Sequence, residues 1–217
     1  MLLDIINIYI DRSDFFIELF LQHVSLTLIS VIIITIIGIS LGILMTRNRL
    51  LAKVVLRFTS FLYTIPSIAL FGFLVAITGI GNRSAITALV LYGILPIIRN
   101  TYVGIIEVDN QIIESAVAMG STENQLLFKI QLPLASPVIM AGFRTMVIMT
   151  ISLGGIASFI GAGGLGVAIW RGITTNFPIM TIAGSLLVAL FAIVTDLLLE
   201  FAENKMKMKI TGKKTEV

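Results

Sequence analysis

The chain has 217 residues, of which 57% are hydrophobic and only 12% are charged, and its mean hydropathy is +1.05. Soluble domains are about 45–50% apolar and about 25% charged. The composition therefore excludes an ordinary soluble domain and predicts an all-α integral membrane protein built as one bundle. The absence of cysteine excludes disulfides and thiolate metal sites. The formal net charge of +3 is distributed in a way that suits lipid rather than nucleic acid.

Apolar runs predict about five membrane-spanning helices, because about 20 apolar residues cross the ~30 Å hydrocarbon core. The predicted spans cover about 24–46, 54–78, 84–106, 134–160 and 178–200. Together they form a transmembrane domain over 23–203. Before it lies an N-terminal segment, 1–22, which lacks the pattern of a cleavable signal peptide. After it lies a basic tail, 204–217, which we expect to fray against anionic headgroups.

The basic residues predict the orientation of the chain in the membrane. They gather between the first two spans, between the third and fourth spans, and in the tail, as Arg47, Arg49, Lys53, Arg57, Arg99, Lys129, Lys205, Lys207, Lys209, Lys213 and Lys214. The opposite side holds Arg12, Arg83 and Arg171 and an acidic N-terminal segment. By the positive-inside rule we expect the N-terminus outside the cell and the C-terminus in the cytoplasm.

A long polar loop from Glu107 to Pro133 separates the third and fourth spans, on the predicted cytoplasmic side. Helical spacing of apolar residues predicts a short helix from Asn110 to Met119, broken by Gly120. A second short helix is predicted from Thr122 to Ile130, with Ser121 or Thr122 as its cap, before Pro133 marks the return to the membrane. The alternative is a pair of amphipathic helices that lie on the membrane surface.

This loop resembles the cytoplasmic loop of permease subunits of bacterial type I ATP-binding-cassette (ABC) importers. Their pattern is E-A-A, three residues, G, nine residues, then I-x-L-P. The matching residues are Glu114, Ser115, Ala116, Gly120, Ile130, Leu132 and Pro133, with Ser115 in place of the first alanine. The resemblance implies the MetI-like permease fold, in which this loop forms the coupling helices that dock on a cytoplasmic ABC ATPase dimer. This chain would then bind no cofactor itself, and ATP and magnesium would belong to the ATPase.

From about Phe20 to Glu203 the chain is also similar to the osmoprotectant branch of these permeases. The similar segments are YTIPSIAL from Tyr63, LPIIRNTYVGI from Leu95, PVIMAGFRT from Pro137 and ASFIGAGGLG from Ala157. This similarity implies uptake of glycine betaine, carnitine or choline across the bacterial plasma membrane. The alternative is import of another small amine, betaine or amino acid, such as ergothioneine or methionine. The implied partners are a second permease subunit, identical or a sister chain, and an extracellular or lipid-anchored solute-binding protein.

Two features suggest where the translocation pathway runs. Pro66 and Pro96 fall inside the second and third spans and predict kinks. We therefore expect the region of Thr64, Pro66 and Ser67 to face the pathway, with ordinary packing as an equal alternative.

The second feature is the glycine cluster GAGGLG, which includes Gly161, Gly163 and Gly164. It matches G-x-G-x-x-G but lacks the βαβ setting of a dinucleotide site. Its predicted role is a tight turn and close helix approach at the outer end of the fourth span. Contact with a binding protein, or gating of the outer mouth, is the alternative.

Charges within the spans are few. Arg144 lies in the fourth span, and Asp196 and Glu200 lie one helical turn apart in the fifth. We expect an ion pair between Arg144 and one of these acids, with a proton relay as the alternative.

Quaternary ammonium groups are often held by aromatic rings. The candidates are Tyr63, Tyr92, Tyr102 and Trp170, although Trp and Tyr also gather at membrane interfaces without any ligand. His23, the single histidine, has no evident second ligand, so no metal site is predicted.

Two other classes of protein are alternatives to a permease. A membrane-embedded enzyme would need a catalytic set within the spans, and none is apparent beyond Asp196 and Glu200. The chain has no GK[ST] tripeptide, so it has no Walker loop of its own. A structural or assembly protein would not need the spacing of the polar loop.

Overall fold

The computed structural model describes residues 2–211, and across them the secondary structure is helical throughout. The elements are α1 (Leu2–Asp11), α2 (Ser13–Arg47), α3 (Arg49–Thr64), α4 (Ser67–Thr78), α5 (Asn82–Ile106), α6 (Asn110–Ala118), α7 (Glu123–Gln125), the π-helical η1 (Leu126–Gln131), α8 (Leu132–Ala157), the 3-10 turn η2 (Ser158–Ile160), α9 (Gly166–Thr174) and α10 (Pro178–Thr211). Four helical stretches within this range are long and apolar enough to cross a membrane, and α3 with α4 makes a fifth if the bent pair counts as one span. The predicted class, all-α with about five spans, is confirmed.

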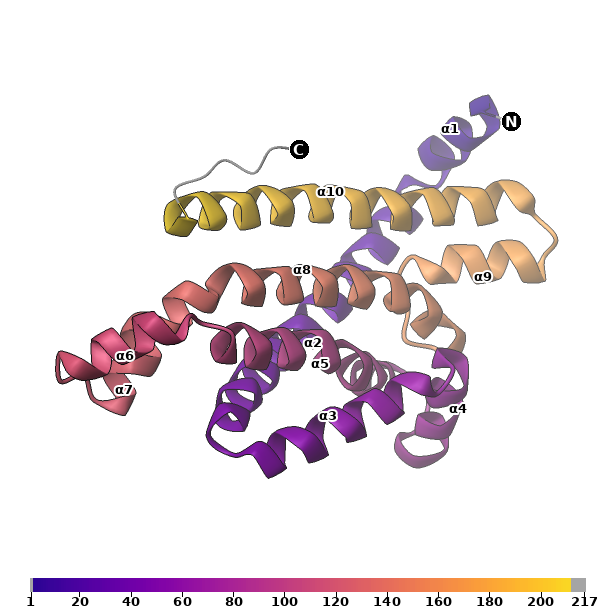
Figure 1. The fold of residues 1–217 in the computed structure, drawn as a ribbon. Coiled ribbons are helices and arrows are strands. Elements are labelled where there is room, and N and C mark those ends of the chain that lie inside the picture. The colour runs from indigo at the N-terminus through magenta and orange to yellow at the C-terminus, as the bar shows by residue number, and fades with distance from the viewer. Residues whose placement is uncertain (1, 212–217) are drawn as a thin grey trace.

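The centre of the bundle is α5, which packs against α2 on one side and α8 on the other. Small residues allow this close approach. An added Cβ on Gly38 of α2 would overlap Ile97, and one on Gly93 of α5 would overlap Ile34. Ile34 and Ile97 are fully buried, as is Ile151 of α8. The core therefore lies where α2, α5 and α8 meet, and α10 lies outside it along α8 and α9 (Figure 1).

The N-terminal segment predicted for residues 1–22 is ordered as helix where it is described. α1 packs on α10, and the Tyr9 hydroxyl donates a hydrogen bond of 2.7 Å to the carbonyl oxygen of Ala183. Phe16 and Leu19, in the first turns of α2, are buried in the same apolar cluster. This segment therefore belongs to the helical body.

The second predicted span, 54–78, has a different shape from the expected kinked helix. α3 ends at Thr64 and α4 begins at Ser67, and their axes are bent by 101°. Pro66 lies at the break with extended backbone (φ −55°, ψ 133°). Proline disfavours helical backbone in the residue before it, and Ile65 is accordingly extended. At Pro96, in contrast, α5 continues as helix through the proline.

The basic tail also differs from the prediction. α10 continues as helix to Thr211, so residues 204–211 extend the fifth span instead of fraying. The reason is continuity: no proline follows Pro178, and no glycine follows Gly184 before Gly212, so nothing in the sequence stops the helix near residue 204. Lys213 and Lys214 lie outside the described residues.

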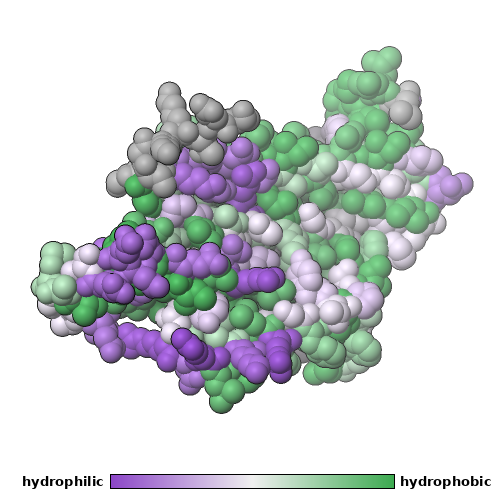
Figure 2. Space-filling view, viewed as in Figure 1, coloured by the Kyte–Doolittle hydropathy of each residue, from purple (hydrophilic) through white to green (hydrophobic). Residues whose placement is uncertain are grey.

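The two predicted groups of basic residues lie at opposite ends of the bundle. The turn between α2 and α3, the loop with α6 and α7, and the far end of α10 share one end (Figure 1). The start of α5 and the turn between α9 and α10 lie at the other. Figure 2 shows hydrophilic surface over the first end and mostly apolar surface over the rest of the visible face. This arrangement agrees with the prediction that most basic residues lie on one side of the membrane.

Candidate functional site

The polar loop begins with a well-capped helix. The Asp109 carboxylate accepts a hydrogen bond of 2.8 Å from the backbone N–H of Gln111, at the start of α6. At its end, Gly120 N–H donates to Val117 and Ser121 N–H donates to Ala116, at 2.9 and 3.1 Å. This pair of bonds is a Schellman motif, which requires a left-handed residue. Gly120 supplies it with a φ of +85°, so the predicted helix break at this glycine is present.

α6 buries one small side chain and exposes much of the rest. Ala116 is buried, whereas Glu114 and Ser115 are exposed. The loop also exposes apolar side chains: Val117 is 55% exposed, Met119 81% and Phe128 60%. Several exposed apolar side chains on one short polar segment are typical of a protein–protein contact. The loop can therefore offer an apolar surface to a partner.

The second half of the loop differs from the prediction of a separate short helix. Thr122 begins α7 with a reciprocal capping box: its side chain accepts from Gln125 N–H, and the Gln125 side chain accepts from Thr122 N–H. From there the helix runs without a break through η1 into α8. Pro133 lies in the first turn of α8.

The π-helical turn explains how the helix passes this proline. Proline cannot donate to the carbonyl four residues back and crowds it. In η1 the bonds shift by one residue, so that Leu132 N–H donates to Leu127. The second half of the loop is therefore a continuous extension of α8.

The base of the loop is anchored in the bundle. Leu127 is buried together with Ile105 of α5 and Ala135 of α8, and Leu132 packs against this cluster. In addition, the Arg47 guanidinium donates a hydrogen bond of 3.0 Å to the Asn124 side chain. Ile130 is half-buried and Pro133 is exposed. The loop is therefore attached to α5, α8 and the end of α2.

The break between α3 and α4 gathers two of the four aromatic candidates. The Tyr92 hydroxyl donates a hydrogen bond to the Ile65 carbonyl, which the break leaves without a helical partner. Tyr63 packs edge-on against Tyr92 with ring centroids 5.9 Å apart. Thr64 is exposed, Pro66 is exposed and Ser67 is half-buried.

The other two aromatic residues lie elsewhere. Trp170 packs on Phe159, and Tyr102 packs against the separate cluster around Met45 and Ile98. The four rings therefore do not form one cage for an ammonium group.

The glycine cluster makes the turn between α8 and α9. Gly161, Gly163 and Gly164 all have positive φ, between 75° and 80°. The Gly164 N–H donates a hydrogen bond of 3.1 Å to the Gln22 side chain of α2. A Cβ on Gly166 would overlap the Gly155 carbonyl oxygen, so α9 starts in close contact with α8. The geometry is the tight turn and close helix approach expected from the sequence.

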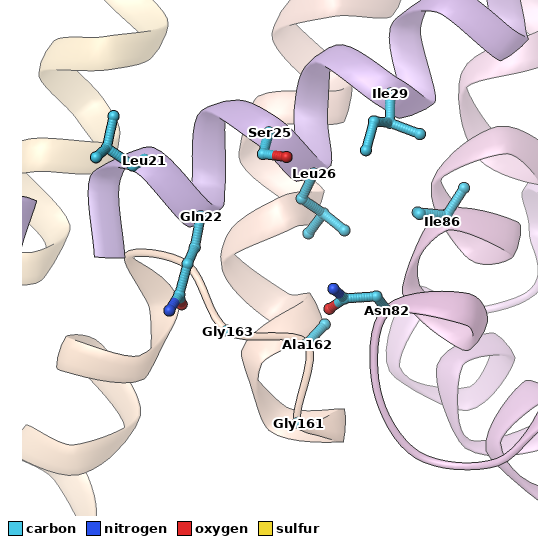
Figure 3. Close-up of a pocket in the computed structure, with 10 residues that line it drawn as sticks. All are labelled: Leu21, Gln22, Ser25, Leu26, Ile29, Asn82, Ile86, Gly161, Ala162 and Gly163. Carbon is cyan, nitrogen blue, oxygen red and sulfur yellow. The ribbon is translucent and has the colours of Figure 1, made fainter. Parts of the chain in front are cut away.

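A pocket of about 550 Å³ lies beside this turn. Gln22 and Ser25 of α2, Asn82 at the start of α5, and residues Gly161 to Gly163 line it (Figure 3). His23 packs against the turn and is fully buried, and its Nε2 lies 3.0 Å from the Ile151 carbonyl oxygen. Its ring contacts the backbone at Gly154 and Gly164 so closely that no Cβ fits there without a shift. His23 therefore has a packing role in joining α2 to α8 and the turn.

The charges within the spans are brought together. The Arg144 guanidinium binds both Asp196 carboxylate oxygens, at 2.5 and 2.8 Å, and also contacts Glu200 at 2.9 Å. The predicted pairing of Arg144 with acids of the fifth span is present. A bidentate arginine–carboxylate contact fixes geometry as well as charge, so it holds α8 against α10.

Two members of this cluster were missed from the sequence. Glu203 lies 3.5 Å from the Arg144 guanidinium and is nearly buried, and Lys207 binds it at 2.6 Å. The signal was available: Glu203 follows Asp196 by seven residues and Lys207 follows it by eleven, so a continuous helix brings both to the same face. The predicted fifth span ended near residue 200, so Glu203 and Lys207 were not placed on the same helix as Asp196.

The sequence matches a known family over most of its length. The model of the family described as "Binding-protein-dependent transport system inner membrane component" matches residues 34–208. The chain belongs to this family. Its members are transport components of the membrane, and this agrees with the apolar spans and with the exposed, anchored loop.

Among relatives, the permease is 40% identical over 197 residues to the glycine betaine/carnitine/choline transport system permease protein OpuCD of Bacillus subtilis, covering 90% of this chain and 86% of the relative. It is 40% identical over 164 residues to the ergothioneine transport permease/ergothioneine binding protein EgtU of Helicobacter pylori, covering 76% of this chain and 30% of that longer protein. A solved structure of the MetNI methionine ABC transporter matches with a TM-score of 0.72 at 24% identity, covering 90% of this permease and 95% of that chain. The structural match confirms the MetI-like fold.

Proposed function

We propose that the permease is the membrane-spanning subunit of an ATP-driven importer for a quaternary-ammonium osmoprotectant such as glycine betaine, carnitine or choline. The substrate class is supported by the relative named for these three solutes, which matches nearly the whole chain. Ergothioneine is the second candidate, supported by a relative of equal identity that matches a shorter part of the permease.

The observation that carries the coupling role is the combination of an exposed apolar tip and a buried base in one loop. Val117 and Met119 project from the loop, while Leu127 is buried between α5 and α8. A separate ABC ATPase dimer would bind the tip and supply ATP and magnesium, which this chain would not bind. Its movement would pass along η1 into α8, and through the Arg144 contacts into α10.

The transport cycle in this proposal is alternating access. Two permease subunits, identical or a sister pair, enclose a pathway between them, and ATP-driven closure of the ATPases turns the bundles outward as rigid bodies. A solute-binding protein delivers substrate at the end of the bundle that holds the glycine turn. The N-terminus is outside the cell, and the basic end with the coupling loop faces the cytoplasm of a bacterium.

Acidic substitutions at the tip test the docking step. Met119→Glu and Val117→Glu place a charge where we expect an apolar contact, and an uncompensated charge at an interface is costly. Both variants should lose most of the co-purifying ATPase and most of the ATP-dependent uptake. Gln111→Glu is the matched control, because it adds the same charge at an exposed position at the start of α6 without removing an apolar side chain. Normal ATPase recovery with both tip variants would refute the docking surface.

A further inference from the structure

α3 has three distinct faces. Five polar side chains are all exposed: Arg49, Lys53, Arg57, Ser60 and Thr64. At 3.6 residues per turn they fall within an arc of about 80°. The neighbouring face is exposed and apolar, with Leu50, Val54, Phe58 and Phe61. The third face, with Ala52 and Thr59, is buried against the bundle. We call the five exposed polar residues the polar edge of α3.

The polar edge reaches far into the span. A single residue, Asn48, separates α3 from the end of α2 at Arg47, where the charge-free run of the first span stops. At 1.5 Å per residue, Arg57 lies about 12 Å and Thr64 about 22 Å farther along the axis than Arg49. The hydrocarbon core is only about 30 Å thick. The edge therefore extends well past the headgroup layer at the basic end of the bundle.

The cations of this edge have no carboxylate partner within the described part of the chain. No ion pair joins Arg49, Lys53 or Arg57 to an acid of residues 2–211. Figure 2 shows a hydrophilic band along the lower edge of the molecule, where Figure 1 places α3. Charged residues at membrane depth rarely face lipid; they face protein or a water-filled cavity. Here the chain itself does not cover them.

We propose that the polar edge of α3 lines a water-filled cytoplasmic half of the translocation pathway, and that the adjacent apolar face is turned away from water. This inference rests on the proposed transport function and names the residues that meet solute and water on the inner side. It also extends the pathway from the Thr64–Ser67 break, at one end of the edge, down to Arg49. Ser60 and Thr64 are then pathway residues, whereas Phe58 and Phe61 are not.

Accessibility of introduced thiols tests the proposal, and the absence of native cysteine gives a clean background. Single cysteines replace Ser60 and Thr64, and the matched controls are Phe58→Cys and Phe61→Cys on the same helical turns. A charged, lipid-insoluble maleimide is applied to native membranes that are open on both sides. Because the thiolate is the reacting form and needs water, we expect Ser60→Cys and Thr64→Cys to react at least about tenfold faster than the two controls.

A second arm separates a pathway from a fixed crevice. Trapping the transporter with ATP and vanadate closes the cytoplasmic half in the proposed cycle, so labelling of Ser60→Cys and Thr64→Cys should slow severalfold. Equal labelling of all four cysteines, or rates unchanged by trapping, would overturn the proposal. Failure of the transport function would appear differently, as an absence of ATP-dependent osmoprotectant uptake by the cysteine-free parent.

Discussion

At the scale of single residues, Gly120 has the most specific backbone requirement in the polar loop from Glu107 to Pro133. Its φ of +85° closes α6 and turns the chain toward α7. No atom lies within 4 Å of a Cβ added there, so the cost of substitution is conformational rather than steric. A left-handed conformation costs about 1–2 kcal/mol for ordinary residues, and asparagine tolerates it better.

Substitutions at Gly120 should therefore separate backbone conformation from side-chain size. We expect Gly120→Val to reorient α6 and to reduce both ATPase binding and uptake. Gly120→Asn, of similar size, should retain most of both. The measurements are initial uptake rates and ATPase recovery on purification at matched expression. Equal activity of the two variants would show that the left-handed turn is not needed for coupling.

At the scale of elements, the strongest connection between α8 and α10 is the Arg144 cluster. Three carboxylates face one guanidinium, so removing the arginine leaves Asp196, Glu200 and Glu203 close together without it. Losing one partner of such a partly buried network is costly because the remaining charges are uncompensated. Losing one of three acids is milder.

Thermal unfolding of the purified permease tests this ranking. Arg144→Met should lower stability by about 1–3 kcal/mol, less than for a fully buried pair because the cluster is partly exposed to solvent. Asp196→Asn should lower it by less, because Glu200 and Glu203 still pair with the arginine. Lys205→Met is the control, since it removes a positive charge from an exposed position of α10 outside the cluster. If Arg144→Met unfolds at the same temperature as the control, the cluster does not hold the two helices together.

The elements also show how far sequence reasoning reaches. Charge-free runs located the spans because crossing a hydrocarbon layer imposes a minimum apolar length. Gly120 and Thr122 were predictable because helix ends need specific backbone or side-chain chemistry. The fusion of the second half of the loop with α8 was not predictable. It requires a shift to π-helical hydrogen bonding in η1 just before Pro133, and no single residue type indicates such a shift.

Tertiary contacts explain the remaining differences from the sequence reading. The sharp break at Pro66 is stabilised by the Tyr92 hydroxyl, which donates a hydrogen bond to the carbonyl of Ile65, 27 residues away. α9 was not predicted as a separate element. It exists because Gly172 and Gly184 let it lie directly against α10. Such pairings become visible only when the helices are placed together. In the candidate site, the loop pattern was recognised from its residue spacing, whereas Glu203 and Lys207 required the true length of α10.

At the scale of the whole molecule, the two ends of the bundle differ, and the proposed function assigns one to the ATPase and the other to the solute-binding protein. The basic end carries the exposed apolar tip, and its anchored base connects to the central helix α5. The opposite end carries the glycine turn and its pocket. Between them, α8 is one continuous helix from the loop to the turn. This arrangement fits a transport component that is moved by a partner rather than one that performs chemistry.

The central claim is that the tip of the loop touches an ATP-hydrolysing subunit on the cytoplasmic side, and crosslinking in native membranes tests it most directly. Met119→Cys is the single thiol in the chain, and a short bifunctional reagent joins it to neighbouring proteins. Ile80→Cys, equally exposed but at the opposite end, is the control. The account predicts a crosslink to the ABC ATPase from Met119→Cys and none from Ile80→Cys. A Met119→Cys thiol that reacts only from outside the cell, or that never crosslinks to an ATPase, would contradict it.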